Sequence, residues 1–412
     1  MTSSGGSAYG TGESMAVSGL IATNLVLSDS KAYITNSDIT TTEAGDVILD
    51  AKNTSAIDAK IVSTTKSGDK AIGVTLAFNT IGWEAQNILF RTIDALLGTD
   101  IGDEDPAQTK AYIEDTTLHI SGDVSVTADN SAQLNATISN AADSQASALY
   151  GAGGTAASAM LASNMVSTDA KSYIDYQTTG TVTVTGAIDI SAKDQAGIYS
   201  NTKIVSSSVT TNDGGVSILN ETIGDIQSAN FLSEDGSQKL VYGDKVRLSD
   251  DYAGGGKKGS VYKFLGNEET MDLSNTDYTN LDYWQIVKGS NIIPEGYNIS
   301  DSDSTAVGGI VVRNDVRADV ESYVDYATVS SASLNITSSE NATIKATADS
   351  VVSSSGGSAY GSGTSLAVNG IIATNLILSK SNTYITNSDI TTTTGDLTLD
   401  AQNTSMLYAL KT

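Results

Sequence analysis

Apolar and polar residues alternate in short runs along almost the whole chain, and a period of two is typical of β-strands. The runs recur in one order. An apolar run ending in Asn is followed by an Ala/Ser/Thr-Tyr-Ile/Val triplet, and then by a strand of the form Gly-Asp-Val-x-Leu-x-Ala. In the first unit these features are Asn24, residues 32–34 and residues 45–51, and an alternating run at 55–59 closes the unit.

This order appears five times, in units of roughly 60–70 residues where nothing interrupts them. The Asn recurs as Asn24, Asn79, Asn164, Asn314 and Asn375, and the Tyr recurs as Tyr33, Tyr112, Tyr173, Tyr323 and Tyr384. If the units stack, the Asn side chains form a hydrogen-bonded ladder along the axis. We expect the Tyr rings to pack on the wall with their hydroxyl groups in water; the alternative is an exposed binding stripe.

The chain also repeats its own beginning. Residues 3–50 and 354–400 are closely similar, at an offset of about 351 residues with one deletion near Ala44. Such identity at long range is the signature of a tandem array, so we expect further copies of the repeat, in tandem or end to end, as partners.

Two architectures fit short alternating strands: a string of immunoglobulin-like sandwiches, or a parallel β-solenoid (β-helix). The units are short for a sandwich and lack the large aromatic residues that its core usually buries. Small inward residues and an Asn at one fixed place favour the solenoid. We therefore predict an all-β fold, a parallel β-solenoid of about five units.

Two inserts interrupt the units, and they hold both Trp and three of the four Phe residues. Helical spacing in the first predicts one short amphipathic helix, and alternation in the second predicts a small antiparallel β module. The expected division is 1–81 (unit one and the start of unit two), 82–108 (helical insert), 109–212 (units two and three and the start of unit four), 213–300 (β module) and 301–412 (units four and five).

Composition and charge limit the partners. The net charge of -26 repels nucleic acid and anionic membranes, so neither is an expected partner. No apolar run approaches the ~20 residues that span a bilayer. Thr2 already lies within a repeat, so no leader follows Met1, and we expect signals for export and anchoring to lie outside this sequence.

The sequence carries no familiar catalytic constellation. His119 is the one His and there is no Cys, which removes Ser-His-Asp, Cys-His and His-based zinc chemistry. We therefore predict no enzyme, no catalytic residues and no cofactor. The acidic residues Asp100, Asp103 and Asp105 are candidate Ca²⁺ ligands, but their spacing is not that of an EF-hand, and a solvated loop is the favoured alternative.

The Gly-Asp-Val-x-Leu-x-Ala strands with Asn- and Thr-rich turns resemble the haemagglutinin-type repeats of filamentous haemagglutinin and related giant bacterial adhesins. The resemblance covers most of the chain outside the two inserts, although the secretion domain of that family is not present. It implies a right-handed parallel β-helix displayed at a bacterial cell surface, and it carries no catalytic residues.

Residues 241–287 resemble the small chitin- and cellulose-binding modules of secreted glycosidases. The shared features are a Gly-Asp-x-Val strand, a Gly-x-Val-Tyr-x-Phe strand and a closing Tyr-Trp-x-x-Val. The resemblance implies that Tyr262, Tyr278, Tyr283 and Trp284 stack on sugar rings. The alternative is that these rings form the core of the module, which otherwise has little to bury.

Three functions follow as hypotheses. The first is a structural segment of a giant extracellular bacterial protein, which serves as an adhesin stalk or surface filament. The second is a carbohydrate-binding adhesin, in which the solenoid is a scaffold and the 213–300 module binds polysaccharide. The third, a polysaccharide-acting β-helix enzyme, requires a carboxylate cluster on one face that the sequence does not display.

Overall fold

The chain is all-β and its sheets are mostly parallel, as the sequence predicts. The computed structural model describes residues 1–3, 13–84, 104–147, 152–211, 229–266, 268–280, 283–287, 301–356 and 362–411. No helix occurs among these residues. The helix expected in the first insert falls mainly on residues 85–103, which lie outside the described residues.

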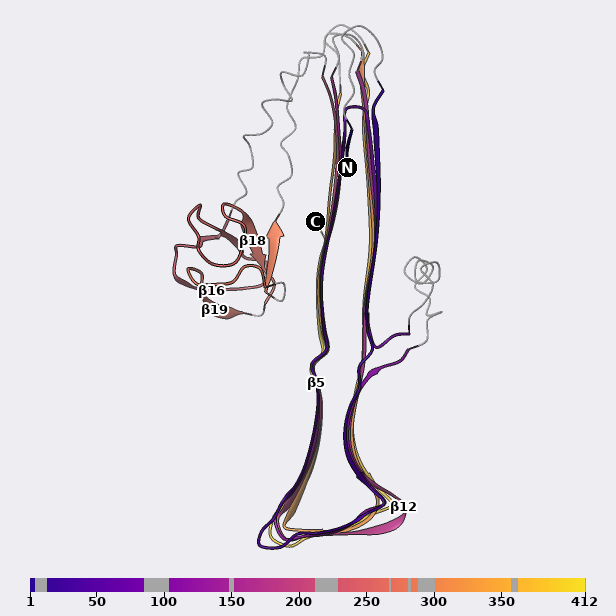
Figure 1. Ribbon diagram of the computed structural model, residues 1–412, viewed down its shortest axis with the longest axis vertical. Coiled ribbons are helices and arrows are strands. Elements are labelled where there is room, and N and C mark those ends of the chain that lie inside the picture. Colours follow the sequence, from indigo (N-terminus) through magenta and orange to yellow (C-terminus); the bar gives the residue numbers. More distant parts are fainter. Residues whose placement is uncertain are drawn as a thin grey trace.

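The chain passes repeatedly around the molecule, and on each pass it adds strands to the same three sheets (Figure 1). Each pass runs through a ten-stranded sheet, then a five-stranded sheet, then a six-stranded sheet. We call one pass a circuit. The ten-stranded sheet is the first wall, and the other two sheets together form the second wall opposite it.

Five circuits account for most of the strands. The first contains β2 (Met15–Val26), β3 (Ser30–Thr35), β4 (Asp38–Thr40), β5 (Val47–Asn53) and β6 (Ala56–Ser67), and β1 (Thr2–Ser3) pairs with β6. The second contains β7 (Lys70–Ile81), β8 (Ala107–Glu114), β9 (Thr117–Ile120), β10 (Val124–Asn130) and β11 (Gln133–Ser147). The third contains β12 (Ala152–Val184), β13 (Ala187–Asp194) and β14 (Gly197–Thr211). The fourth contains β21 (Ser302–Ser331), β22 (Ser333–Glu340) and β23 (Thr343–Ser355), and the fifth contains β24 (Ser365–Thr386), β25 (Asp389–Thr392), β26 (Leu397–Asn403) and β27 (Met406–Lys411).

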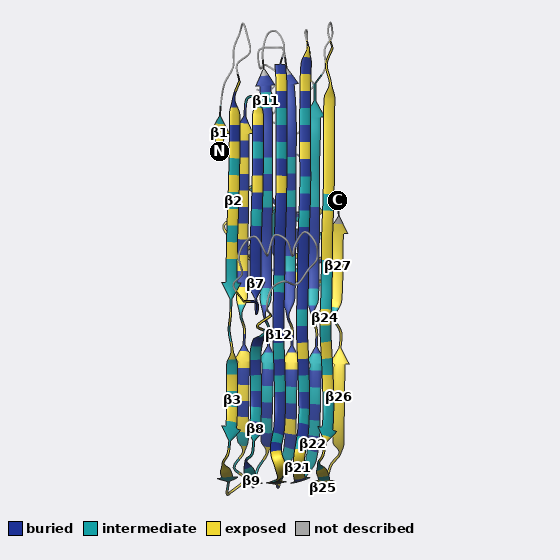
Figure 2. Ribbon diagram, turned by 90° about the vertical axis from the view of Figure 1, so that its right-hand side faces the viewer, coloured by how far each residue is buried: buried dark blue, intermediate teal, exposed yellow. Residues whose placement is uncertain are grey.

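Successive circuits pair in parallel with equivalent repeat positions face to face (Figure 2). Val124 of the second circuit, for example, pairs with Val47 of the first and Ile188 of the third. The longest pairing, between β12 and β21, keeps one register until a shift between Asp175 and Gly180. Because equivalent residues stack, whatever side chain occupies one repeat position forms a row along the stacking axis.

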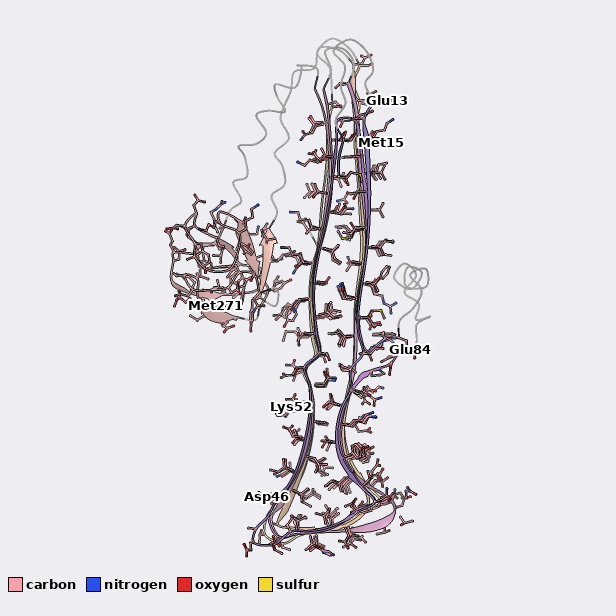
Figure 3. All side chains as sticks on the ribbon, viewed as in Figure 1. Glu13, Met15, Asp46, Lys52, Glu84 and Met271 are labelled. Carbon is pink, nitrogen blue, oxygen red and sulfur yellow. The ribbon has the colours of Figure 1, made fainter. Side chains whose placement is uncertain are left out.

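The space between the walls is filled by two apolar clusters and, beyond them, by small residues (Figure 3). Where small residues fill it, the walls approach closely. A Cβ atom at Gly154 would lie 2.9 Å from Ser208 Oγ on the opposite wall, and one at Gly308 would lie 2.5 Å from Val352 Cγ2. Small inward residues are therefore a requirement of the wall spacing and not a sign of weak packing.

Gly308 and its neighbour Gly309 provide a matched test of this wall contact. A Cβ at Gly308 collides with Val352, whereas a Cβ at Gly309 meets nothing within 4 Å. We expect Gly308→Val to lower the free energy of unfolding by about 1–3 kcal/mol, as overpacking does. Gly309→Val should change it by less than about 0.5 kcal/mol, the range of ordinary surface substitutions. Thermal and denaturant unfolding measure both, and equal effects would contradict the proximity of the walls.

The second insert forms a separate small module with its own core. Its strands are β15 (Phe231–Leu232), β16 (Ser237–Leu240), β17 (Lys245–Arg247), β18 (Val261–Phe264), β19 (Glu269–Asp272) and β20 (Trp284–Val287). They form a four-stranded sheet in the order β15-β17-β18-β20 and a two-stranded sheet of β16 and β19. All pairs are antiparallel except that of β15 with β17.

The two ends of the stack leave apolar residues uncovered. Large apolar side chains exposed in the first circuit are Met15, Val17, Ile21, Leu27, Tyr33, Ile48 and Val62. Those exposed in the fifth circuit are Leu366, Val368, Ile372, Leu378, Leu397, Leu399, Met406, Leu407, Tyr408 and Leu410. Figure 2 shows the fifth circuit as a largely exposed edge beside the buried third and fourth circuits.

Candidate functional site: two ladders and the inserted module

The five repeated Asn residues form one continuous chain of hydrogen bonds through all five circuits. Nδ2 of Asn24 donates to Oδ1 of Asn79 at 2.7 Å, and Asn79 donates in the same way to Asn164 at 2.8 Å. Asn164 donates to Asn314 at 2.9 Å, and Asn314 donates to Asn375 at 2.7 Å. The repeat predicted a ladder of these five residues, and the structure brings them together.

The ladder also joins the two walls. Asn164 Nδ2 donates a second hydrogen bond, at 3.0 Å, to Ser200 Oγ on β14 of the second wall. Asn79, Asn164 and Asn314 have no exposed surface. Because an unpaired buried polar group costs about 1–3 kcal/mol, each amide fixes the register of its neighbours.

The position of an Asn within the ladder sets the cost of removing it. Asn164→Ala leaves the Nδ2 group of Asn79 and the Oδ1 atom of Asn314 without their partners inside the core. We expect it to lower the free energy of unfolding by about 2–4 kcal/mol. Asn24→Ala, at the half-buried end, should cost about 1 kcal/mol because one bond is lost. Denaturant unfolding of both variants measures the difference, and equal losses would show that the ladder is not a cooperative element.

The five repeated Tyr residues form a second row, as a stack of parallel rings on the first wall. Centroid distances are 5.2, 5.0, 4.7 and 4.9 Å from Tyr33 through Tyr112, Tyr173 and Tyr323 to Tyr384. The interplanar angles are 8° or less. This stacking follows from the strand spacing, because rings at equivalent positions are carried one strand apart.

Two tyrosine hydroxyl groups of this row bond to carboxylates. Tyr173 OH donates to Glu114 Oε1, and Tyr384 OH donates to Glu321 Oε1, each at 2.8 Å. Burial and then the hydrogen bond to the carboxylate raise the pKa of both phenols. The row is a packed element of the wall, with its rings covering one another.

The first insert leaves the wall at Gly82 and is anchored by a buried aromatic residue. Trp83, predicted to lie in the amphipathic helix, instead forms an isolated antiparallel bridge with Glu104. The Arg317 guanidinium lies over the Trp83 ring, 4.7 Å from its centroid, and Nη1 of Arg317 donates to Glu104 Oε2 at 3.1 Å. The base of the insert is therefore fastened to the fourth circuit.

Most of the rings proposed to bind sugar lie inside the module. Trp284 and Tyr278 are 1% exposed and Tyr262 is 6% exposed, within one apolar cluster. Tyr283 is 37% exposed. A ring must present a face to stack on a sugar, so Tyr283 alone of the four has that access here. The physical reason is the small size of the module, which uses its large rings as a core.

The module contacts the outer face of the second wall through buried lysines. Tyr242 OH lies 3.0 Å from Thr347 Oγ1, and Lys263 Nζ donates to the same hydroxyl at 3.1 Å. Lys345 Nζ donates to the Leu265 carbonyl oxygen at 3.3 Å. Burial lowers the pKa of Lys263 and lowers that of Lys345 to about 8.

The predicted Ca²⁺ ligands are only partly within the described chain. Asp100 and Asp103 lie outside the described residues, and Asp105 is exposed, with its amide donating to the Gly82 carbonyl oxygen at 3.1 Å. Within the described ranges, no group of three or more His, Cys, Asp or Glu side chains is arranged to hold a metal. Ca²⁺ binding by this acidic loop stays a prediction.

A further inward row of polar residues was not predicted from the sequence. It lies two residues beyond the last position of each Gly-Asp-Val-x-Leu-x-Ala strand, and its members are Asn53, Asn130, Asp194, Glu340 and Asn403. The period of two places this position on the same inward face as the preceding Ala. Extending the repeat alignment by two residues would have found it.

Comparisons with protein-family models, curated proteins and solved structures found no match for the chain. In the part of the chain that the structure describes, no helix is long and apolar enough to cross a membrane.

Proposed function

We propose that the chain is a parallel β-solenoid and a structural segment of a giant extracellular bacterial protein, acting as an adhesin stalk or surface filament. One observation carries the proposal. The fifth circuit repeats the sequence of the first and stacks on the fourth in the same register that joins the other circuits. A repeat that stacks on the preceding repeat is what a continuing array requires.

The open edge of the fifth circuit fits such a continuation. Asn375 and Tyr384 repeat Asn24 and Tyr33, which the second circuit covers. By the repeat, the edge beyond Asn375 is equivalent to the edge that carries a second circuit. Its exposed Leu399 side chain marks the inward face that such a circuit would bury. Further copies of the repeat are therefore the proposed partners.

The proposed filament would be much wider than the rise of one period along its axis. Four circuits at a strand spacing of ~4.8 Å rise by about 19 Å for each 351-residue period. The strand β12 alone has 33 residues, which is about 110 Å of extended chain. One period is thus a wide, thin slab, and several periods must stack before the object is longer than it is wide.

The proposed role is mechanical, with no catalytic step. Backbone hydrogen bonds between circuits run along the stacking axis and resist separation together, since the long strands of neighbouring circuits are paired along much of their length. The first insert leaves between β7 and β8, and the second leaves between β14 and β21, so both would decorate the filament once per period. Continuous pairing and repeated decoration support a stalk or filament.

Surface display is tested with an antibody raised against the module, residues 229–287. We expect it to label intact cells of the source organism, because the proposal places the module on the outside of an exported filament. Electron microscopy of immunogold-labelled cells makes the measurement, and permeabilised cells serve as the control for total protein. Labelling that appears only after permeabilisation would contradict an extracellular role.

A further inference from the structure

In the inward row from Asn53 to Asn403, the side chains at the two ends are hydrogen-bonded to the facing wall. In the first circuit, Asn53 Nδ2 donates to Ser28 Oγ at 3.0 Å. In the fifth, Asn403 Nδ2 donates to Ser379 Oγ, also at 3.0 Å. At both ends, therefore, an amide of the second wall meets a serine of the first wall across the core.

In the three middle circuits, the residues of this row do not bond to a serine of the facing wall. Asn130, Asp194 and Glu340 are stacked neighbours with no exposed surface. Among the described residues, four of their oxygen atoms have no hydrogen-bond partner: Asn130 Oδ1, Asp194 Oδ2 and both carboxylate oxygens of Glu340. Three backbone groups lie against these side chains: Asn130 Nδ2 donates to the Ala107 carbonyl oxygen, the Ala196 amide donates to Asp194 Oδ1, and the Ala342 amide lies near enough to Glu340 to lower its pKa.

The facing wall supplies one side-chain donor to these three circuits. The positions equivalent to Ser379 are Ala107, Thr168 and Ala318. The two alanines have no side-chain donor, whereas the Thr168 hydroxyl donates to the Arg317 carbonyl oxygen at 3.3 Å and lies near enough to Asp194 to lower the pKa of that carboxyl. The enclosed oxygen atoms therefore outnumber the donors beside them, most of all at Glu340.

The electrostatic surroundings are also negative. Asp129 and Asp169 add to the field at Asp194, and Asp319 adds to the field at Glu340. The amide of Ala342 offsets part of this at Glu340. Burial raises the pKa of both inward carboxyl groups, and the charge of Asp194 raises that of Glu340 further.

The nearby lysines are engaged elsewhere. Lys110 and Lys171 each lie 3.7 Å from Asp169, and Lys171 also lies 3.3 Å from Glu321. Lys380 lies 3.4 Å from Asp319, on the exposed surface. A buried carboxylate pair that lacks a cationic side chain is costly, by several kcal/mol per ion, unless another positive charge compensates it.

We infer that Asp194 and Glu340 hold a Ca²⁺ ion inside the stack, between their two levels, with Asn130 one level further along the axis. Ca²⁺ takes carboxylate and amide oxygens at 2.3–2.6 Å. Strands are ~4.8 Å apart, so an ion midway between two stacked carboxylates lies about 2.4 Å from each level. The site is distinct from the acidic loop at Asp105, and it joins the third and fourth circuits, where the module is inserted between β14 and β21.

The test uses the full chain, unfolded in guanidinium and refolded with Ca²⁺, with Mg²⁺, or with a chelator. Refolding is needed because the site is sealed, so that the ion enters as the circuits close. After gel filtration we expect Ca²⁺ at a one-to-one ratio in the wild type, measured by mass spectrometry of the metal. We expect a higher melting temperature for the Ca²⁺-refolded chain than for the chelator-refolded chain.

Two variants test whether Ca²⁺ binding depends on the two inward carboxyl groups. The Asp194→Asn/Glu340→Gln double variant keeps the shape of the row and should lose both the bound Ca²⁺ and its effect on melting. Asp319→Asn, an exposed acid beside the site, should retain both. A wild type that refolds with no metal, and melts identically with and without chelator, would overturn the inference and identify the pair as neutral acids that share protons. That outcome would leave the proposed filament role untouched.

Discussion

Parallel, in-register hydrogen bonding between successive circuits is the constraint on which the rest of the structure depends. It requires that each repeat position meet its own equivalent one strand away. A side chain therefore persists at an inward position only if it can bond or pack against a copy of itself. An amide meets this condition because it is both donor and acceptor, and the Asn24 to Asn375 ladder is the result.

The same constraint explains where the chain varies. Inserts leave at Gly82 and after β14, between strands, so that the pairing on either side is preserved. The wall positions that touch across the core, such as Gly154 and Gly308, must be small because both walls are fixed by their own pairing. Carboxylates at Asp194 and Glu340 break the pattern of self-complementary side chains, because a stacked pair of anions repels itself. This departure is what marks the row as a candidate ion site.

The sequence predicted the elements that depend on period and position. The five units, the Asn and Tyr rows and the places of both inserts follow from counting residues between like motifs. The sequence did not predict how near the walls lie, since that distance depends on all inward residues together. It assigned Trp83 to a helix from spacing alone, whereas the described residue bridges to Glu104. For Trp284 and Tyr278 it left binding and core packing open, because aromatic residues serve both purposes and only burial distinguishes them.

The most direct test of the account is the length of chains that carry one, two and three tandem periods. Small-angle scattering and electron microscopy would measure how the dimension along the stacking axis grows with each added period. Four circuits per period predict an increase of about 19 Å, with the cross-section unchanged. Separate domains joined in a string would lengthen the particle by several times that amount for each period, and such growth would contradict continuous stacking of the circuits.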